Sequence, residues 1–386
     1  MLQLVFGRSG YGKTEYIRNR IADMIDRGET QVLLITPEQY SFISEYSLLE
    51  QLGEARAHAV RCLSFSRLCD ECDRLYGADG RKPLTKGGKA ILMKTAIDQV
   101  RPDLELFEKK GSSAAFVQSM TGIYDEMKSC NLSGAAVYAA ADDLDTDILR
   151  CKMRDFSRIM TAYEALLGDR FADPANRLTR LYDQIKDQNY FAGQTVFLDG
   201  FNGFVAQEYK ILERIIAEAK AVYIALDSDS FGMGDGYDLF AYVNETAGIL
   251  QRIADKAGVP TNALQLSENC RTDYADLRRV EQYIFADQAP ETEIPAEHIR
   301  LYAASTVTDA CNDLALQIKG LLRCGYRAGE IAVTMRDREK YAPVLASAFE
   351  KYGVPYYADE RQPVTAQPIL VFPMYLMPVS YTHLRA

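Results

Sequence analysis

The chain opens with a short apolar run, a glycine-rich turn and an amphipathic stretch, an order that predicts a strand, a loop and a helix. The run ends at Phe6, and apolar residues then recur at helical spacing at Tyr16, Ile17, Ile21, Met24 and Ile25. Further short apolar runs at 31–36 and 59–65 predict two buried strands, each followed by a helix. Strands that alternate with helices in this way indicate an α/β fold with a layered sheet.

The helix after the second strand is predicted to start at Pro37, which ends a strand and is tolerated in the first turn of a helix. Its apolar residues recur at helical spacing, which predicts that they face the core. These residues are Phe42, Ile43, Tyr46, Leu49 and Leu52.

The pattern changes at residue 84, and helical periodicity then continues to 190 without a convincing strand. Strand-like runs return at 195–201 and 221–226, with a helix of apolar spacing between them. Because the sheet pattern resumes after the helices, we interpret 84–190 as a helical insertion. The host would be one α/β domain with a first part at 1–83 and a second part at 191–286.

A second α/β unit is predicted after a turn and helix at 266–279. Residues 287–297 (DQAPETEIPAE) contain two prolines and four acids, which is typical of a linker. Beyond it, 298–376 predicts strands at 298–303, 331–335 and 354–356 and helices at 308–324 and 341–352. These strands are too few to close a sheet, so we expect a fragment of a longer chain. The final stretch, 377–386, continues no periodicity and is expected to be a non-native tail.

Composition and charge narrow the class of protein. The chain has 386 residues with 48% hydrophobic and 25% charged content, which suits a globular protein of two or three domains. No apolar run approaches the ~20 residues of a membrane helix, so we expect no membrane association and a cytoplasmic location. A net charge of −10 argues against nucleic-acid binding by the whole surface, although a local basic groove remains compatible with it.

The eight cysteines show no spacing typical of a disulfide framework. Cys69 and Cys72 form a Cys-x-x-Cys, but they lie in a predicted helix with no second pair nearby. This arrangement favours reduced thiols over a metal site, which would need further ligands.

The turn after the first strand, GRSGYGKT, fits the phosphate-loop pattern of Gly, four residues and Gly-Lys-Thr. Glycines let backbone N–H groups surround an anion, the lysine reaches the terminal phosphates, and the threonine hydroxyl can ligate Mg²⁺. A plain glycine turn between strand and helix is the alternative. The predicted ATP-binding residues are Gly7, Arg8, Ser9, Gly10, Tyr11, Gly12, Lys13 and Thr14.

A phosphate loop also needs an acid near the Mg²⁺, and Asp199 at the end of a predicted strand is the candidate. A strand-end Asp-Gly turn is the alternative reading. ATP hydrolysis usually requires a glutamate beside this aspartate, but the next residue is Gly200. Glu208 is too remote in sequence to be assumed a substitute. The sequence thus predicts Mg²⁺ binding by Thr14 and Asp199, with weak or absent hydrolysis.

Two arginines and four strand-end residues are further candidates. Arg271 and Arg336 could reach a γ-phosphate, although exposed arginines would look the same in the sequence. Single-stranded nucleic acid would cross the loops at the ends of the second and third strands and meet aromatic side chains there. The candidates are Gln39, Tyr40, Ser64 and Phe65, and helix packing explains Phe65 equally well.

Four segments together resemble one family: GRSGYGKT, LLITPEQYSFISE, RCLSFSRL and VFLDGFNGF. They resemble the N-terminal part of the B subunits of bacterial AddAB helicase–nucleases, relatives of UvrD-type superfamily-one helicases. The similarity runs in order from residue 2 to about 370. Asp-Gly-Phe in place of the helicase Asp-Glu separates this family from ordinary motors.

The resemblance implies a RecA-like phosphate-loop NTPase domain with a helical insertion, followed by an incomplete second RecA-like domain. It also implies a heterodimer with AddA that processes DNA double-strand ends for recombinational repair. The family's C-terminal exonuclease domain, with Mg²⁺-binding carboxylates and an iron–sulfur cluster, would lie outside this chain. None of the eight cysteines maps onto a cluster ligand.

Three other functions remain open. An active ATP-dependent DNA helicase of superfamily one would need a water-activating glutamate, and Gly200 speaks against it. A phosphate-loop small-molecule kinase would not need the second α/β unit that begins at His298. The third alternative is a scaffold in which bound ATP only stabilises the fold.

Overall fold

The computed structural model describes residues 1–77, 80–110, 113–229, 239–286, 290–291 and 293–358, together with 369, 371 and 372. The chain forms two compact units, Met1–Ile294 and Pro295–Ala386. Their boundary falls inside the linker predicted at 287–297. The predicted tail, 377–386, lies outside the described residues.

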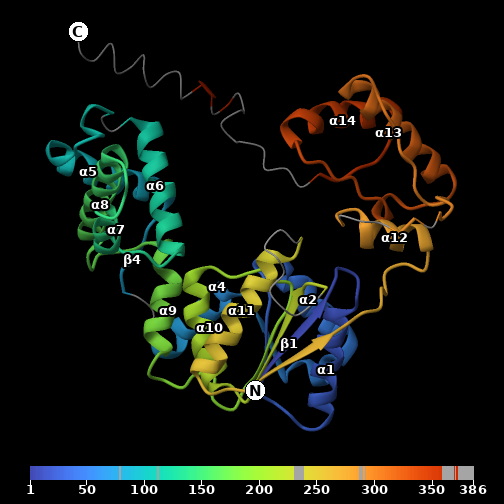
Figure 1. Ribbon diagram of the computed structural model, residues 1–386, viewed down its shortest axis with the longest axis horizontal. Coiled ribbons are helices and arrows are strands. Elements are labelled where there is room, and N and C mark those ends of the chain that lie inside the picture. The colour runs from blue at the N-terminus through green and yellow to red at the C-terminus, as the bar shows by residue number, and fades with distance from the viewer. Residues whose placement is uncertain are drawn as a thin grey trace. The chain divides into compact units, whose positions relative to one another are not determined.

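A parallel sheet is the centre of unit 1 (Figure 1). Its strands lie in the order β3-β2-β6-β7-β1-β8, and all neighbouring pairs are parallel. The strands are β1 (Leu2–Gly7), β2 (Val32–Ile35), β3 (Val60–Leu63), β6 (Thr195–Leu198), β7 (Ala221–Asp227) and β8 (Thr261–Gln265). Five of them confirm the predicted strands and the α/β class.

The sixth strand, β8, was not predicted. It lies at the edge of the sheet, and its residues are half-buried or exposed. An edge strand with polar residues carries no continuous apolar run, so its sequence does not have the pattern of a buried strand.

Helices cover both faces of this sheet, as β2 illustrates. Val32 and Leu34 pack with α1 (Lys13–Asp26) and α2 (Glu38–Leu52) on one face. Leu33 and Ile35 point to the other face, because successive side chains of a strand alternate. The helices there are α4 (Phe65–Tyr76), α9 (Arg177–Ile185), α10 (Ala206–Glu218) and α11 (Ala241–Lys256). Two further short helices of unit 1 are α3 (Glu54–Ala57), before β3, and α12 (Ala275–Tyr283), after β8.

The predicted inward stripe of α2 is wrong for four of its five members. Only Leu52 is buried, at 3% exposure, whereas Phe42 is 76% exposed. Ile43, Tyr46 and Leu49 are exposed as well. The helix instead buries Ser41, Leu48 and Leu52 against the sheet. Apolar residues occur on more than one side of α2, so their spacing alone does not identify the buried face.

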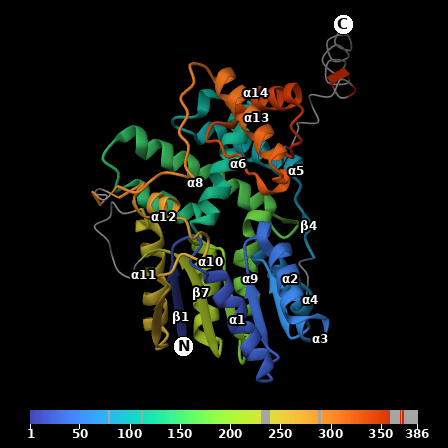
Figure 2. The same cartoon turned by 90° about the vertical axis from the view of Figure 1, so that its right-hand side faces the viewer.

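The helical insertion has a hydrophobic core of its own, separate from the two cores of the sheet. Its main helices are α5 (Lys86–Val100), α6 (Ala114–Ser129), α7 (Gly134–Ala141) and α8 (Asp147–Leu167). Figure 2 shows α5, α6 and α8 gathered away from the strands β1 and β7. Short elements join them, namely η1 (Arg101–Asp103), η2 (Glu108–Lys110), η3 (Pro174–Asn176) and the two-residue parallel pair β4 (Lys82–Pro83) and β5 (Phe171–Ala172).

The insertion ends earlier than residue 190. Leu181 and Ile185 of α9 belong to the core of the sheet, whereas Leu167 at the end of α8 belongs to the insertion's core. The Gln207 amide of α10 donates to the Ala175 carbonyl, 3.0 Å away, and so joins the two parts. A helix that returns to the sheet has the same periodicity as one in the insertion, so the sequence does not separate them.

Unit 2 is organised around two helices, α13 (Val307–Arg323) and α14 (Arg338–Tyr352), joined through η4 (Ala328–Glu330). Both helices were predicted. The strands predicted at 298–303, 331–335 and 354–356 are wrong, because the structure assigns no strand to those described residues. A strand exists only where a neighbour pairs with it, and an apolar run cannot show whether such a neighbour is present.

None of the helices in the described part of the chain is long and apolar enough to cross a membrane.

Candidate functional site

A cleft of about 580 Å³ opens at the carboxyl ends of the strands of unit 1. The segments after β1, β2 and β8 contribute Ser9, Thr36 and Arg271 to its walls. Asp199 follows β6, and Asp227 is the last residue of β7. Open parallel sheets bind ligands at this edge, where the strand order reverses. The cleft is therefore the candidate binding site of unit 1.

The predicted phosphate loop forms one wall of this cleft, and two of its glycines adopt left-handed conformations. Gly12 has φ 77° and lies directly before α1, so the first turn of the helix faces the cleft. Gly10 has φ 90°, and a Cβ placed there would lie 3.0 Å from the Cβ of Arg271. The Gly10 carbonyl also accepts the backbone N–H of Cys270 at 2.8 Å. Side chains at these positions would be strained, which explains the glycines.

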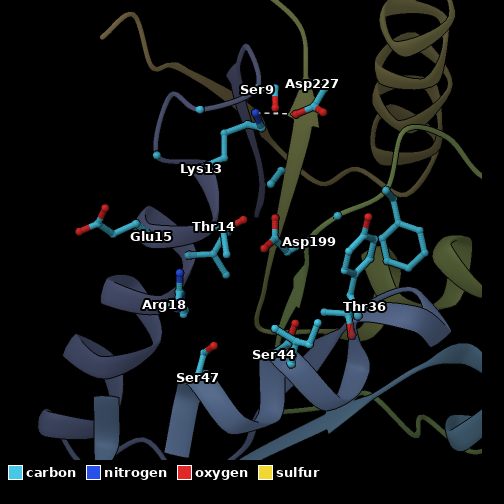
Figure 3. A pocket seen from close by; sticks show the side chains of 18 of the residues that line it. Ser9, Lys13, Thr14, Glu15, Arg18, Thr36, Ser44, Ser47, Asp199 and Asp227 are labelled. Atoms are coloured by element: carbon cyan, nitrogen blue, oxygen red, sulfur yellow. Dashed lines mark ion pairs between the residues drawn. The ribbon is translucent and has the colours of Figure 1, made fainter. Parts of the chain in front are cut away.

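Lys13 lies folded back onto the loop. Its ammonium group donates to the carbonyls of Gly7 at 2.7 Å and Arg8 at 2.9 Å. It also forms an ion pair of 2.5 Å with Asp227 (Figure 3). The Lys13 side chain is only 10% exposed, whereas that of Asp227 is 42% exposed. Asp227 thus neutralises the lysine that the sequence assigned to the terminal phosphates.

Thr14 and Asp199, the two residues that the sequence analysis assigned to Mg²⁺, face each other across the cleft (Figure 3). Asp199 is 8% exposed, and this burial raises its pKa above the usual range. A hydrogen bond from Thr14 and the attraction of Lys13 and Arg18 oppose the increase. Two protein oxygens cannot fill an octahedral shell, so Mg²⁺ would take its other ligands from phosphate and water.

Two other residues of the loop point away from the cleft. The Arg8 guanidinium donates to the carbonyls of Glu281 at 3.1 Å and Gln282 at 3.2 Å, near the end of α12, and forms an ion pair of 2.9 Å with Asp229. The Tyr11 hydroxyl donates to the Glu281 carboxylate at 3.2 Å. These side chains hold the loop in place, and only their backbone could serve a phosphate.

The position beside Asp199, where a water-activating glutamate would stand, is taken by Gly200, which lines the cleft. The Glu208 carboxylate accepts the backbone N–H of Val205 at 2.9 Å, at the start of α10. Its role is therefore to cap a helix, and burial raises its pKa.

The two predicted arginines lie in different units. Arg271 lines the cleft and contacts the loop at Gly10, which is consistent with a contact to a terminal phosphate. Arg336 belongs to unit 2 and lines a cleft of that unit. Its role at a γ-phosphate stays a prediction.

The predicted DNA-binding residues differ in accessibility. Gln39 is exposed, and Tyr40 is 48% exposed at the edge of the cleft. Ser64 is 1% exposed and accepts the Arg67 backbone N–H, which caps α4. Phe65 is 5% exposed and packs on Phe201 with ring centroids 5.8 Å apart. As placed, Ser64 and Phe65 offer no surface to a base, and helix packing explains Phe65.

Several cleft residues were missed by the sequence analysis. Asp227 directly follows the strand predicted at 221–226, so the strand-end signal used for Asp199 could have identified it. Arg18 follows Thr14 by one helical turn and therefore shares its face. Ser44 and Ser47 reach the cleft from α2, and nothing in the sequence indicated that this side of α2 faces α1.

Among the residues that the structure describes, the thiols form no metal site. Cys69 and Cys72 are buried in α4, and burial raises the pKa of each to about 12. Among the described residues, no group of three or more histidine, cysteine, aspartate or glutamate side chains could hold a metal ion. Both cysteines therefore fill the core as neutral thiols.

The comparisons with known proteins all indicate the same family. Residues 4–281 match the family described as "ADDB, N-terminal". A protein of Clostridium botulinum strain Langeland, named as the B subunit of an ATP-dependent helicase/deoxyribonuclease, is 27% identical over 96% of this chain and 33% of its own length. Proteins of the same name from Clostridioides difficile and a Thermoanaerobacter species are 28% and 25% identical, over 96% and 98% of this chain and 33% and 34% of their own lengths.

The chain spans about a third of the length of these curated relatives. The family match begins in β1, includes the phosphate loop and Asp199, and extends into α12. It thus covers the sheet of unit 1 and every strand end that lines the cleft. The chain belongs to the AddB N-terminal family.

Proposed function

We propose that this chain is the ATP-binding, helicase-like part of an AddB-type protein, built on a RecA-like phosphate-loop domain. The observation that carries the proposal is the cleft where Lys13, Thr14 and Asp199 meet at the carboxyl ends of parallel strands. The relatives' name, which is that of one subunit of an ATP-dependent helicase/deoxyribonuclease, agrees with this chemistry.

ATP would bind with its phosphates on the loop amides at the start of α1. The Lys13 ammonium would leave its ion pair with Asp227 and bind the terminal phosphates instead, because both partners are anionic. Thr14 and Asp199 would hold Mg²⁺, which neutralises phosphate charge when bound. Arg271 lies against Gly10 and would meet the phosphates from the other wall of the cleft.

Hydrolysis at this site would be weak or absent. Gly200 stands where a water-activating glutamate is needed, and Glu208 is committed to the cap of α10. An active superfamily-one helicase is therefore the second candidate, whereas a small-molecule kinase has no support from the relatives' names.

The function of the whole protein follows from the relatives rather than from this chain. We propose a heterodimer with AddA that processes DNA double-strand breaks for recombinational repair in the cytoplasm. The exonuclease and its iron–sulfur cluster would belong to segments outside this chain. Gln39 and Tyr40 remain candidates for contact with single-stranded DNA, because both are accessible beside the cleft.

A binding experiment with Lys13→Ala tests the proposal. Labelled ATP should bind the unsubstituted chain in a Mg²⁺-dependent manner. The substitution should weaken binding by about 10- to 100-fold, because a charge-assisted hydrogen bond contributes about 1.5–3 kcal/mol. Lys94→Ala is the matched control, since Lys94 is exposed on α5 and pairs only with the neighbouring Asp98 in the described structure. Mg²⁺-independent binding, or equal binding by Lys13→Ala, would refute the site.

Steady-state ATPase activity with single-stranded DNA separates the two candidates. The proposal expects turnover near background in the intact chain. Robust turnover that Lys13→Ala abolishes would instead identify an active motor.

A further inference from the structure

The inner end of the cleft lies between α1 and α2, beyond Thr14 and Asp199. Arg18 lines it from α1, and Ser44 and Ser47 line it from α2. Its floor is apolar, because Ile17 is fully buried and Leu34 is 2% exposed. This end of the cleft is thus a polar recess over an apolar floor.

Two local features hold the polar side chains around this recess. Arg18 is four residues after Thr14, so both side chains lie on one face of α1, about 6 Å apart along the axis. The side-chain amide of Gln51, one turn after Ser47, donates to the Asn19 Oδ1 at 2.8 Å and ties α2 to α1. Figure 3 shows Arg18, Ser44 and Ser47 around one hollow.

Arg18 has no direct partner in the described part of the chain. Its Nε is buried without a hydrogen-bond partner, and no ion pair to its guanidinium forms there. Its positive charge acts on Asp199, where it opposes the rise in pKa that burial causes. By contrast, Arg8 and Arg67 both form direct ion pairs. A buried guanidinium N–H without an acceptor is costly, so a bound anion that accepts from the Arg18 Nε would stabilise this arrangement.

We propose that Arg18, Ser44 and Ser47 form a phosphate-binding subsite separate from the phosphate loop. A guanidinium matches two oxygens of a phosphate at once, and serine hydroxyls can donate to the others. The offset of about 6 Å along α1 separates this position from phosphates at the start of the helix. The ligand is free orthophosphate or a backbone phosphate of DNA, which present the same oxygens. The subsite does not require that the loop bind ATP.

Binding of labelled orthophosphate by equilibrium dialysis tests the subsite. The chain is first saturated with Mg²⁺–ADP, so that the loop is filled. One orthophosphate per chain should bind, and Arg18→Gln should weaken this binding at least tenfold, with a smaller loss for Ser47→Ala. Arg20→Gln should change it less than twofold, because Arg20 lies on the same helix but donates to the Tyr223 hydroxyl. Thermal unfolding of each variant verifies its fold.

The same measurement is repeated with Lys13→Ala and no nucleotide. Orthophosphate bound there in an Arg18-dependent manner supports the subsite even if the loop binds no ATP, so the two proposals fail separately. A short single-stranded oligonucleotide that displaces orthophosphate would identify DNA as the source, and failure to displace it would identify free phosphate. Absent orthophosphate binding, or binding equal in Arg18→Gln, would overturn the subsite.

Discussion

The ion pair between Lys13 and Asp227 predicts that Asp227→Asn increases the affinity for nucleotide. The Lys13 Nζ and the Asp227 Oδ1 are 2.5 Å apart, and phosphate must displace the carboxylate to reach the lysine. Asp227 is 42% exposed, so solvent screens the pair, and we expect it to contribute about 1 kcal/mol. Removal of this competitor should tighten binding of Mg²⁺–ATP about fivefold. Lys13 keeps its two carbonyl acceptors, Gly7 and Arg8, so the loop should hold its shape.

Isothermal titration calorimetry with Mg²⁺–ATP measures this change. Asp26→Asn is the matched control, because it removes the same charge from an exposed pair on α1. The gain should shrink as ionic strength rises, since it is electrostatic. Unchanged or weaker binding by a folded Asp227→Asn protein would refute the reasoning and indicate that Asp227 contributes to the bound state.

Three further predictions concern two buried carboxylates and the orientation of α2. Asp155→Ala should lower the free energy of unfolding by about 3 kcal/mol in urea denaturation, because the fully buried carboxylate accepts three backbone N–H groups; a loss below about 1 kcal/mol would contradict this. Burial raises the pKa of Asp199, so its ionised form destabilises the folded state at neutral pH, and this cost disappears below the unfolded-state pKa. Unliganded Asp199→Asn should therefore unfold at no lower temperature at pH 7, while Mg²⁺-dependent nucleotide binding falls; retained Mg²⁺ dependence would exclude Asp199 as a ligand. On α2, Leu48→Ala should cost about 2–5 kcal/mol and Phe42→Ser less than about 0.5 kcal/mol in the same denaturation assay, and the reverse order would mean that the helix is rotated.

Local sequence patterns were sufficient for five of the six strands in the sheet of unit 1. A buried parallel strand needs a continuous apolar run, and the five runs that met this rule became β1, β2, β3, β6 and β7. The glycine-rich turn after β1 could also be predicted from the sequence, because the left-handed conformations at Gly10 and Gly12 favour glycine.

Features that depend on contacts with another element could not be predicted from local patterns. The run at 331–335 has the pattern of a strand. A strand must pair with a neighbour, however, and the local sequence does not show whether one is present. The stripe on α2 was assigned to the core, yet the sheet contacts another side of that helix and leaves Phe42 exposed.

The sequence by itself determined the α/β class, the helical insertion within the sheet and the positions of Lys13, Thr14 and Asp199, because each is recorded in periodicity or in a short motif. Only the tertiary structure decided that Asp227 neutralises Lys13 and that Arg18, opposite α2, has no direct partner among the described residues. These facts depend on which side chains meet across elements far apart in the chain. Such tertiary contacts follow from the packing of the whole core, and no local sequence pattern encodes them.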